Sequence, residues 1–159
     1  MSIGGGIRNL TGEVGEVTRL GWGIAVRQEI RRGQLGASFQ LGSHAFTFRD
    51  ETIPNELRLR GYTVSLGPRY YQTLPFRIGS LADSPVELII GAEYALWGIS
   101  ENRRADLTGL DLTYHALGPS LTLSWNWNGI LIQARNFYGE IFSWPGGVYT
   151  FDLSVGLGF

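Results

Sequence analysis

Large apolar side chains occupy every second position along most of this chain. Seven segments show the alternation, at residues 20–27, 35–42, 62–71, 87–96, 120–127, 130–135 and 148–159. A period of two residues is typical of a β-strand with one apolar face, and helical periodicity is nearly absent. The pattern therefore predicts seven strands, together with a weaker, Gly-rich eighth strand within residues 2–10.

The segments between these strands are of two kinds. Short turns are expected at residues 31–33 and 127–129, and the second carries Asn-Gly, a strong hairpin signal. Longer polar connections are expected near residues 11–17, 47–56, 99–107 and 142–147. In an up-and-down strand order, the short turns and both termini lie at one end, and these longer connections lie at the other.

Two features depart from this scheme. Residues 72–85 are predicted to form a long connection, although they belong at the short-turn end. The tripeptide Leu-Gly-Pro occurs twice within predicted strands, at residues 66–68 and 117–119. Because proline cannot donate a hydrogen bond to the strand ladder, we expect a bulge or a strand end at each of them.

The residues between the large apolar positions indicate which face of the sheet meets water. Most are Gly, Ser or Thr, and the charged ones are Arg27, Glu29, Arg69, Glu87, Glu93, Arg135 and Asp152. On the outside of a soluble barrel, so many glycines would weaken the strands and pack against nothing. Inside a narrow membrane barrel they make room, while the large apolar face meets lipid. The pattern favours an all-β fold, a transmembrane up-and-down antiparallel β-barrel of about eight strands, as a single domain over residues 1–159.

This arrangement sets further expectations for both faces. Tyr and Trp near the strand ends of the outward face should form an aromatic girdle at the membrane–water interfaces. The girdle residues are Trp22, Tyr70, Trp125, Trp127 and Tyr149. The seven inward charged residues should form ion pairs, because an eight-stranded barrel is filled by its side chains and an unpaired buried charge is costly. We therefore favour a filled polar interior over a conducting path.

The last strand ends in an aromatic residue that follows a run of alternating apolar positions. These positions are Tyr149, Phe151, Leu153, Val155, Leu157 and Phe159. The segment resembles the C-terminal signal of bacterial outer-membrane barrels, and the whole pattern is similar to small eight-stranded barrels of the OmpA/OmpX type. The resemblance implies a bacterial outer-membrane location, contact with the lipid bilayer, and recognition of the last strand by the barrel assembly machinery.

Composition narrows the possible functions. The chain has a formal net charge of −1, which gives no general electrostatic case for binding nucleic acid. It has no Cys and only two histidines, so disulfides, thiolate catalysis and a His-rich metal site are excluded. No run of about 18 apolar residues forms a transmembrane helix. No signal peptide is recognisable, and we expect that one has been removed.

Candidate catalytic residues are few. The two-residue alternation places His115 on the outward face near the longer connections (we call this outward parity, and the opposite inward parity). A lipid-modifying enzyme could use a His there with a Ser and a carboxylate. No Ser lies two positions away, and Asp111 is the only acid nearby. His44 has inward parity and is expected to be a polar interior residue.

We therefore expect no catalytic residue, cofactor or metal site, and favour a structural or interaction role through external loops. An external ligand or partner would contact the loops near residues 47–56, 99–107 and 142–147, with both termini periplasmic. The alternatives are a lipid-modifying outer-membrane enzyme, a narrow pore, and a soluble lipocalin-like barrel with an apolar, lipophile-binding interior.

Overall fold

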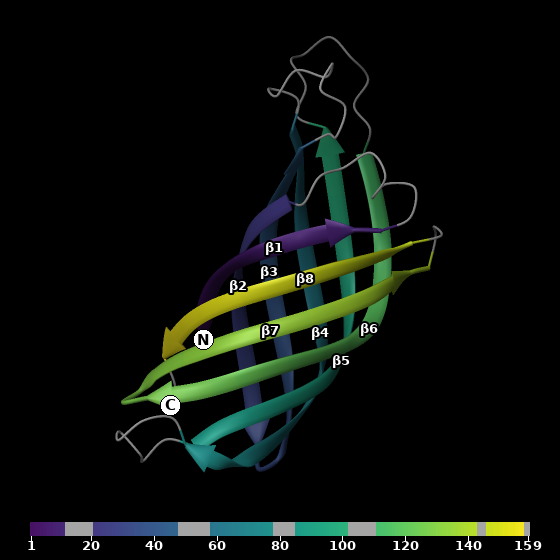
Figure 1. Ribbon diagram of the computed structural model, residues 1–159. Helices are drawn as coiled ribbons and strands as arrows, with labels where there is room; N and C mark the ends of the chain where they lie inside the picture. The colour runs from purple at the N-terminus through teal and green to yellow at the C-terminus, as the bar shows by residue number, and fades with distance from the viewer. Residues whose placement is uncertain (12–20, 48–57, 78–84, 102–110, 143–145, 158–159) are drawn as a thin grey trace.

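The computed structural model describes residues 1–11, 21–47, 58–77, 85–101, 111–142 and 146–157, which form eight strands. The strands are β1 (Ser2–Leu10), β2 (Gly21–Arg32), β3 (Leu35–Thr47), β4 (Arg58–Arg77), β5 (Pro85–Glu101), β6 (Asp111–Trp127), β7 (Ile130–Ile141) and β8 (Gly147–Leu157). Each pairs antiparallel with its neighbours in sequence, and β1 also pairs with β8, so the sheet closes into a barrel (Figure 1). The predicted eight-stranded up-and-down barrel is confirmed. Within the described ranges, no helix has the length and apolar character needed to cross a membrane.

Two tight turns lie at the same end of the barrel as both termini (Figure 1). The β6–β7 turn is Asn128-Gly129, and both residues have positive φ, 50° and 84°. This is the requirement of a type I′ turn, whose twist matches the flanking strands. The β2–β3 turn lies at residues 33–34, with Gly33 at a φ of 65°, so it begins two residues later than the predicted turn at 31–33.

Two strands are longer than the sequence pattern predicts. β4 continues to Arg77, so residues 72–77, which were expected in a connection, belong to a strand. Its pairing with β5 continues past a register shift between Thr73 and Arg77, and Arg77 still lies opposite Pro85. β5 likewise runs to Glu101 instead of ending before residue 99. Alternation weakens at these ends, while backbone pairing between neighbouring strands continues.

The two prolines lie inside continuous strands, and the predicted bulge or strand end is wrong at both. Leu66 pairs with Tyr94 and Arg69 with Gly91, so the β4–β5 register is unchanged across Pro68. The register of β6 and β7 is likewise the same on both sides of residue 119.

The glycine before each proline explains how the strand continues. A Cβ atom on Gly67 would collide with the carbonyl oxygen of Ala92, and one on Gly118 with the carbonyl oxygen of Tyr138. The neighbouring backbone therefore occupies space that only glycine leaves free. Close approach of the strands at Gly takes the place of the predicted bulge at Pro.

The outer surface of the barrel is an apolar belt. Ile24, Leu66 and Val155 are 58, 55 and 57% exposed, whereas the charged residue Glu93 is 1% exposed. This distribution is the reverse of that in a soluble protein, where exposed strand positions are polar and large apolar residues are inside. It matches a barrel whose outward face meets lipid, and it excludes the soluble barrel with an apolar, lipophile-binding interior.

The aromatic residues expected in the girdle lie on the outward face, toward the two ends of the barrel. Trp22 lies at the end with the longer connections, and Tyr70 and Trp127 lie at the short-turn end; all three are exposed. Trp125 is half-buried, with its ring stacked 6.1 Å from that of Trp127. Tyr149 is also half-buried. This placement is the one expected for side chains with an apolar body and a polar tip at the edges of a bilayer.

The first prediction concerns the apolar belt. Leu66→Arg should lower the unfolding free energy in phospholipid vesicles by about 2–4 kcal/mol, because it places a charge on the lipid face at mid-height. Gln34→Arg, in the exposed β2–β3 turn, is the control and should change it by about 1 kcal/mol or less. The folded fraction is measured as the band that resists SDS unheated and shifts on boiling. Equal effects of the two substitutions would contradict a lipid-facing belt.

Candidate functional site: the barrel interior

The inward side chains form three layers along the barrel. At the short-turn end is a cavity, which we call the vestibule. In the middle lies a charged network, formed by Arg8, Arg27, Arg69, Glu93, Arg135 and Asp152. Toward the longer connections lies an aromatic plug, formed by Leu10, Phe46, Ala95, Trp97, Tyr114, Ala116, Phe137 and Val148.

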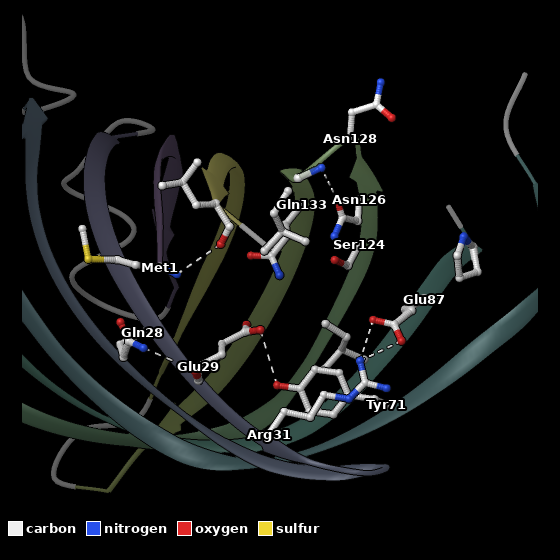
Figure 2. Close-up of a pocket in the computed structure, with 15 residues that line it drawn as sticks. Met1, Gln28, Glu29, Arg31, Tyr71, Glu87, Ser124, Asn126, Asn128 and Gln133 are labelled. Atoms are coloured by element: carbon white, nitrogen blue, oxygen red, sulfur yellow. Dashed lines mark hydrogen bonds and ion pairs between the residues drawn. The ribbon is translucent and has the colours of Figure 1, made fainter. Parts of the chain in front are cut away.

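The vestibule has a volume of about 640 Å³ and is lined mostly by polar side chains (Figure 2). On one wall, Arg31 Nη1 donates to both carboxylate oxygens of Glu87, at 2.7 and 2.9 Å. The Arg31 guanidinium also lies over the Tyr71 ring, 4.4 Å from its centre. The Tyr71 hydroxyl donates to Glu29 Oε2 over 3.4 Å. Two of the predicted interior charges, Glu29 and Glu87, are therefore placed in a space that opens at the barrel end.

Glu93 on β5 is the centre of the charged network. Its Oε2 accepts from Arg69 Nη2 at 2.5 Å, and its Oε1 accepts from Arg135 Nη2 and, at 2.6 Å, from Ser65 Oγ. These partners belong to β4 and β7, so the carboxylate joins three strands across the interior. A buried carboxylate with several charge-assisted hydrogen bonds recovers the interactions that it loses on leaving water.

Asp152 on β8 extends this network to the seam where the barrel closes. Arg135 Nη1 donates to its Oδ2 at 3.0 Å, and Arg8 Nη1 lies 2.6 Å from its Oδ1. Arg8, on β1, was missed by sequence reasoning because its strand is Gly-rich and weakly patterned. Arg8 lies an even number of residues from Ser2 and Gly4, so it shares their inward face, and following the two-residue alternation along β1 could have found it.

Arg27 differs from the other network members. Its Nε and Nη2 donate to Gln40 Oε1, at 3.0 and 2.7 Å, and it has no carboxylate partner in the described part of the chain. The network thus contains four arginines and two carboxylates. All seven predicted charges were expected to form ion pairs. Within the described part of the chain, Arg27 and Glu29 interact instead with neutral side chains.

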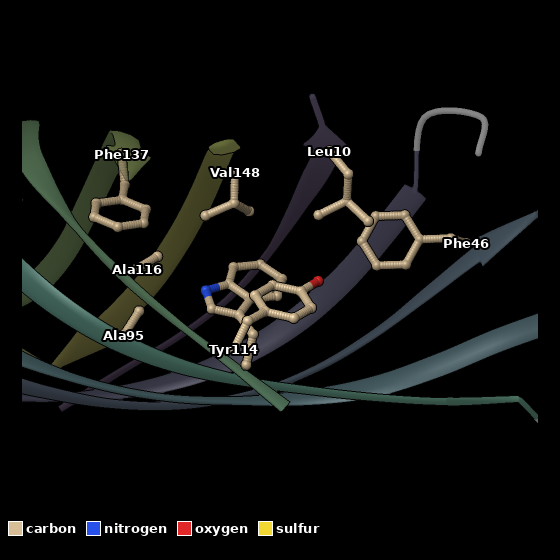
Figure 3. Packing of buried hydrophobic residues seen from close by; sticks show 8 residues of the cluster. Leu10, Phe46, Ala95, Tyr114, Ala116, Phe137 and Val148 are labelled. Atoms are coloured by element: carbon tan, nitrogen blue, oxygen red, sulfur yellow. The ribbon is translucent and has the colours of Figure 1, made fainter. Parts of the chain in front are cut away.

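The aromatic plug fills the interior near the longer connections. Figure 3 shows Leu10, Phe46, Phe137 and Val148, from four different strands, gathered around Tyr114. The predicted polar interior is therefore wrong for this layer. Inward parity continues along each strand, but the residues at these positions change from small and polar to large and apolar.

His44 is buried within this layer. Its ring centre lies 4.5 Å from that of Trp97 and 5.4 Å from that of Phe46, and Thr63 Oγ1 lies 3.2 Å from Nδ1. The inward position expected from its parity is observed, but its surroundings are aromatic. Phe46 and Trp97 could have been found in the sequence, because they continue the parity of His44 and Ala95 next to predicted loops.

His115, the candidate catalytic residue, lies on the outer surface. It is exposed, and its Nδ1 is in hydrogen-bond contact with the hydroxyl of Tyr94. Among the described side chains, neither a Ser nor a carboxylate forms a hydrogen bond with it. The Asp111 side chain lies outside the described residues. None of the described side chains supplies His115 with the Ser nucleophile and the orienting acid of a hydrolytic triad.

β8, the last strand, pairs with β1 on one side and β7 on the other. Leu153, Val155 and Leu157 are exposed on the outward face, as the alternation requires. Tyr149 and Phe151 continue this face and are half-buried, and the Tyr149 hydroxyl donates to Asn136 Oδ1 at 2.6 Å. Phe159, the terminal residue of the predicted assembly signal, lies outside the described residues.

Comparison with known proteins supports the fold. No family model and no curated protein matches the sequence. Solved structures with a similar fold include three of which the chain covers at least 95%. Neisserial surface protein A is 13% identical over 99% of this chain, with a TM-score of 0.65. Ail, the attachment invasion locus protein of Yersinia pestis, is 18% identical over 99% of it, with a TM-score of 0.54. The outer membrane enzyme PagL is 6% identical over 100% of it, with a TM-score of 0.51.

These neighbours are small outer-membrane barrels, so the predicted resemblance in fold is confirmed. At these identities the likeness extends to the fold alone. Ail has also been crystallised in complex with the heparin analogue sucrose octasulfate.

The second prediction concerns the centre of the network. Glu93→Gln should lower the unfolding free energy by about 3–5 kcal/mol, because it removes the carboxylate that pairs with Arg69 and leaves Arg135 paired with Asp152 alone. Glu140→Gln makes the same chemical change on the exposed surface and should have little effect. Denaturant titration of the SDS-resistant band measures both. A loss for Glu93→Gln no larger than that for Glu140→Gln would show that the network does not stabilise the barrel.

Proposed function

We propose that this protein is an integral anchor in the bacterial outer membrane that acts through contacts at the end with the longer connections. It neither conducts solutes nor catalyses a reaction. The observation that carries the proposal is the filled interior: the charged network and the aromatic plug occupy the barrel above the vestibule. Such filling is expected for eight strands, because the cross-section is only wide enough for side chains.

The space between the layers is small. A second cavity, lined by Arg135, Phe137, Trp97 and their neighbours, has a volume of about 10 Å³. This is about the space that one water molecule needs. A hydrated ion or a nutrient molecule is much larger, so passage would require both layers to rearrange.

The outside of the barrel supports membrane residence. The apolar belt offers lipid a continuous surface, and aromatic side chains flank it at both ends. In the proposed orientation, the termini and tight turns face the periplasm, and the connections near residues 47–56, 99–107 and 142–147 face outward. The barrel assembly machinery would recognise β8 through its outward apolar residues.

A lipid-modifying activity is the weaker alternative. PagL, an outer membrane enzyme, has the same fold, which shows that such barrels can support catalysis. His115 lies on the outer surface, as a lipid-acting residue would. The one hydrogen-bond contact of its side chain among the described residues is with the hydroxyl of Tyr94, and no described carboxylate orients the ring.

The third prediction tests the filled interior. In planar lipid bilayers, the folded protein should give no stable conductance steps of the size produced by a general porin reconstituted in the same way. A 16-stranded porin, whose interior is an aqueous channel, serves as the positive control. Stable steps of porin size would overturn the anchor role, since they require an open path through the network and the plug.

The fourth prediction tests the contact surface. Arg103 and Arg104 are adjacent in the connection between β5 and β6, and arginines are suited to bind sulfate groups. Ail forms a complex with a heparin analogue, so immobilised heparin is a suitable probe. We expect retention that is lost when both arginines are replaced by Ser, while Arg32→Ser, at the other end, retains it. Equal retention of the two variants would contradict a heparin-like ligand at this connection.

A further inference from the structure

The vestibule contains a carboxylate whose hydrogen-bonding capacity is largely unused. Glu29 is half-buried on β2 and accepts one long hydrogen bond, 3.4 Å from the hydroxyl of Tyr71. No arginine forms an ion pair with it among the residues that the structure describes. Glu87, on the same wall, is different, because Arg31 occupies both of its oxygens. Glu29 is thus available to a cation that enters the vestibule.

A second side chain, on the facing wall, has an unused donor. Gln133 on β7 is 1% exposed, and its Oε1 accepts long hydrogen bonds from Ser2 and Ser154, both 3.4 Å. Among the described residues its Nε2 has no hydrogen-bond partner, although a buried donor without one is costly. Figure 2 shows the Gln133 amide at the cavity surface, across from Glu29 and Tyr71. An acceptor atom of a ligand would satisfy this donor.

The two groups together define the ligand. The Glu29 carboxylate would pair with a positively charged group of the ligand. Gln133 Nε2 would donate a hydrogen bond to a carbonyl or carboxylate oxygen of the same molecule. The charged side chains that line the vestibule are Glu29, Glu87 and Arg31, and the Met1 ammonium group, which donates to the carbonyl oxygen of Leu157, also lies at its wall. Because Arg31 pairs with Glu87, Glu29 is the charged side chain of this lining that has no ion-pair partner among the described residues. The volume, about 640 Å³, lies within the range of small-molecule sites. A short peptide with a free amino end has both groups, separated by a few bonds.

We propose that the vestibule binds the amino end of a short peptide, with its ammonium group on Glu29 and a peptide carbonyl oxygen on Gln133 Nε2. Ser124 and Asn126 also line the cavity. Asn126 Oδ1 accepts from the Gly129 backbone N–H at 2.9 Å, so the Ser124 hydroxyl and the Asn126 Nδ2 donor would meet the rest of the peptide backbone. The site lies at the end of the barrel opposite the proposed contact surface, so it would be a second function of the same protein. Its failure would leave the anchor role untouched.

Isothermal titration of the folded protein in detergent micelles with trialanine tests the ammonium contact. We expect binding that weakens at least tenfold with N-acetyl-trialanine, which has no ammonium group. Glu29→Gln should also weaken trialanine binding at least tenfold, while Glu140→Gln, the matched change on the outer surface, leaves it unchanged. The heat-induced gel shift verifies that each variant is folded. No binding of trialanine, or equal binding of the acetylated peptide, would overturn the proposal.

The carbonyl contact is tested by NMR of the side-chain amides. The Gln133 Nε2 signal, assigned by its loss in Gln133→Met, should shift when trialanine is added. Gln133→Met should weaken binding several-fold. Spermidine has ammonium groups and no carbonyl oxygen, and it should bind more weakly than trialanine and leave the Gln133 signal in place. Spermidine binding as tight as that of trialanine would overturn the assignment of a peptide, as would a Gln133 signal that trialanine does not move.

Discussion

The rest of the structure depends on how buried charge is compensated inside a barrel whose outside meets lipid. Glu93 accepts hydrogen bonds from two arginines and a serine on other strands. Asp152 accepts from Arg135 and forms an ion pair with Arg8, which lies on β1. Each carboxylate therefore connects strands that are distant in sequence, and Asp152 does so at the seam between β8 and β1. Apolar packing, which stabilises a soluble core, contributes less between a barrel and lipid, because lipid is as apolar as the side chains that it contacts.

The three interior layers lie at different heights along the barrel axis, and each has a different role. The aromatic plug closes the end with the longer connections, and the charged network fixes the strands in the middle. Within the described part of the chain, the vestibule at the short-turn end is polar and open to solvent. A barrel built in this way presents two distinct surfaces to water. The first is the rim formed by the longer connections. The second is a cavity in which, among the described residues, Glu29 has no ion-pair partner and Gln133 Nε2 has no hydrogen-bond partner.

The glycine and proline pairs show how a narrow barrel tolerates residues that interrupt its hydrogen bonds. At Gly67 and Gly118 the neighbouring strand occupies the space of the missing side chain, and the register continues past each proline. Each proline removes one backbone hydrogen-bond donor from its strand, but the pairing with the neighbouring strand continues. The one register shift of β4 lies farther along, between Thr73 and Arg77, where the strand extends beyond the tight turns.

The sequence alone determined the strand count, the antiparallel order, the direction of each face and the resemblance to outer-membrane barrels. These follow from a period of two residues, which is a local property of the chain and is visible without knowing any contact. Strand ends were predicted less well, because backbone pairing does not require alternation. The tertiary structure alone decided the partners: Arg31 meets Glu87 across 56 positions, and Arg27 meets Gln40 instead of an acid. Parity shows that a side chain points inward, but the strand tilt and register fix its height. That height placed Glu29 in an open vestibule, Glu93 in the network and His44 among aromatic rings.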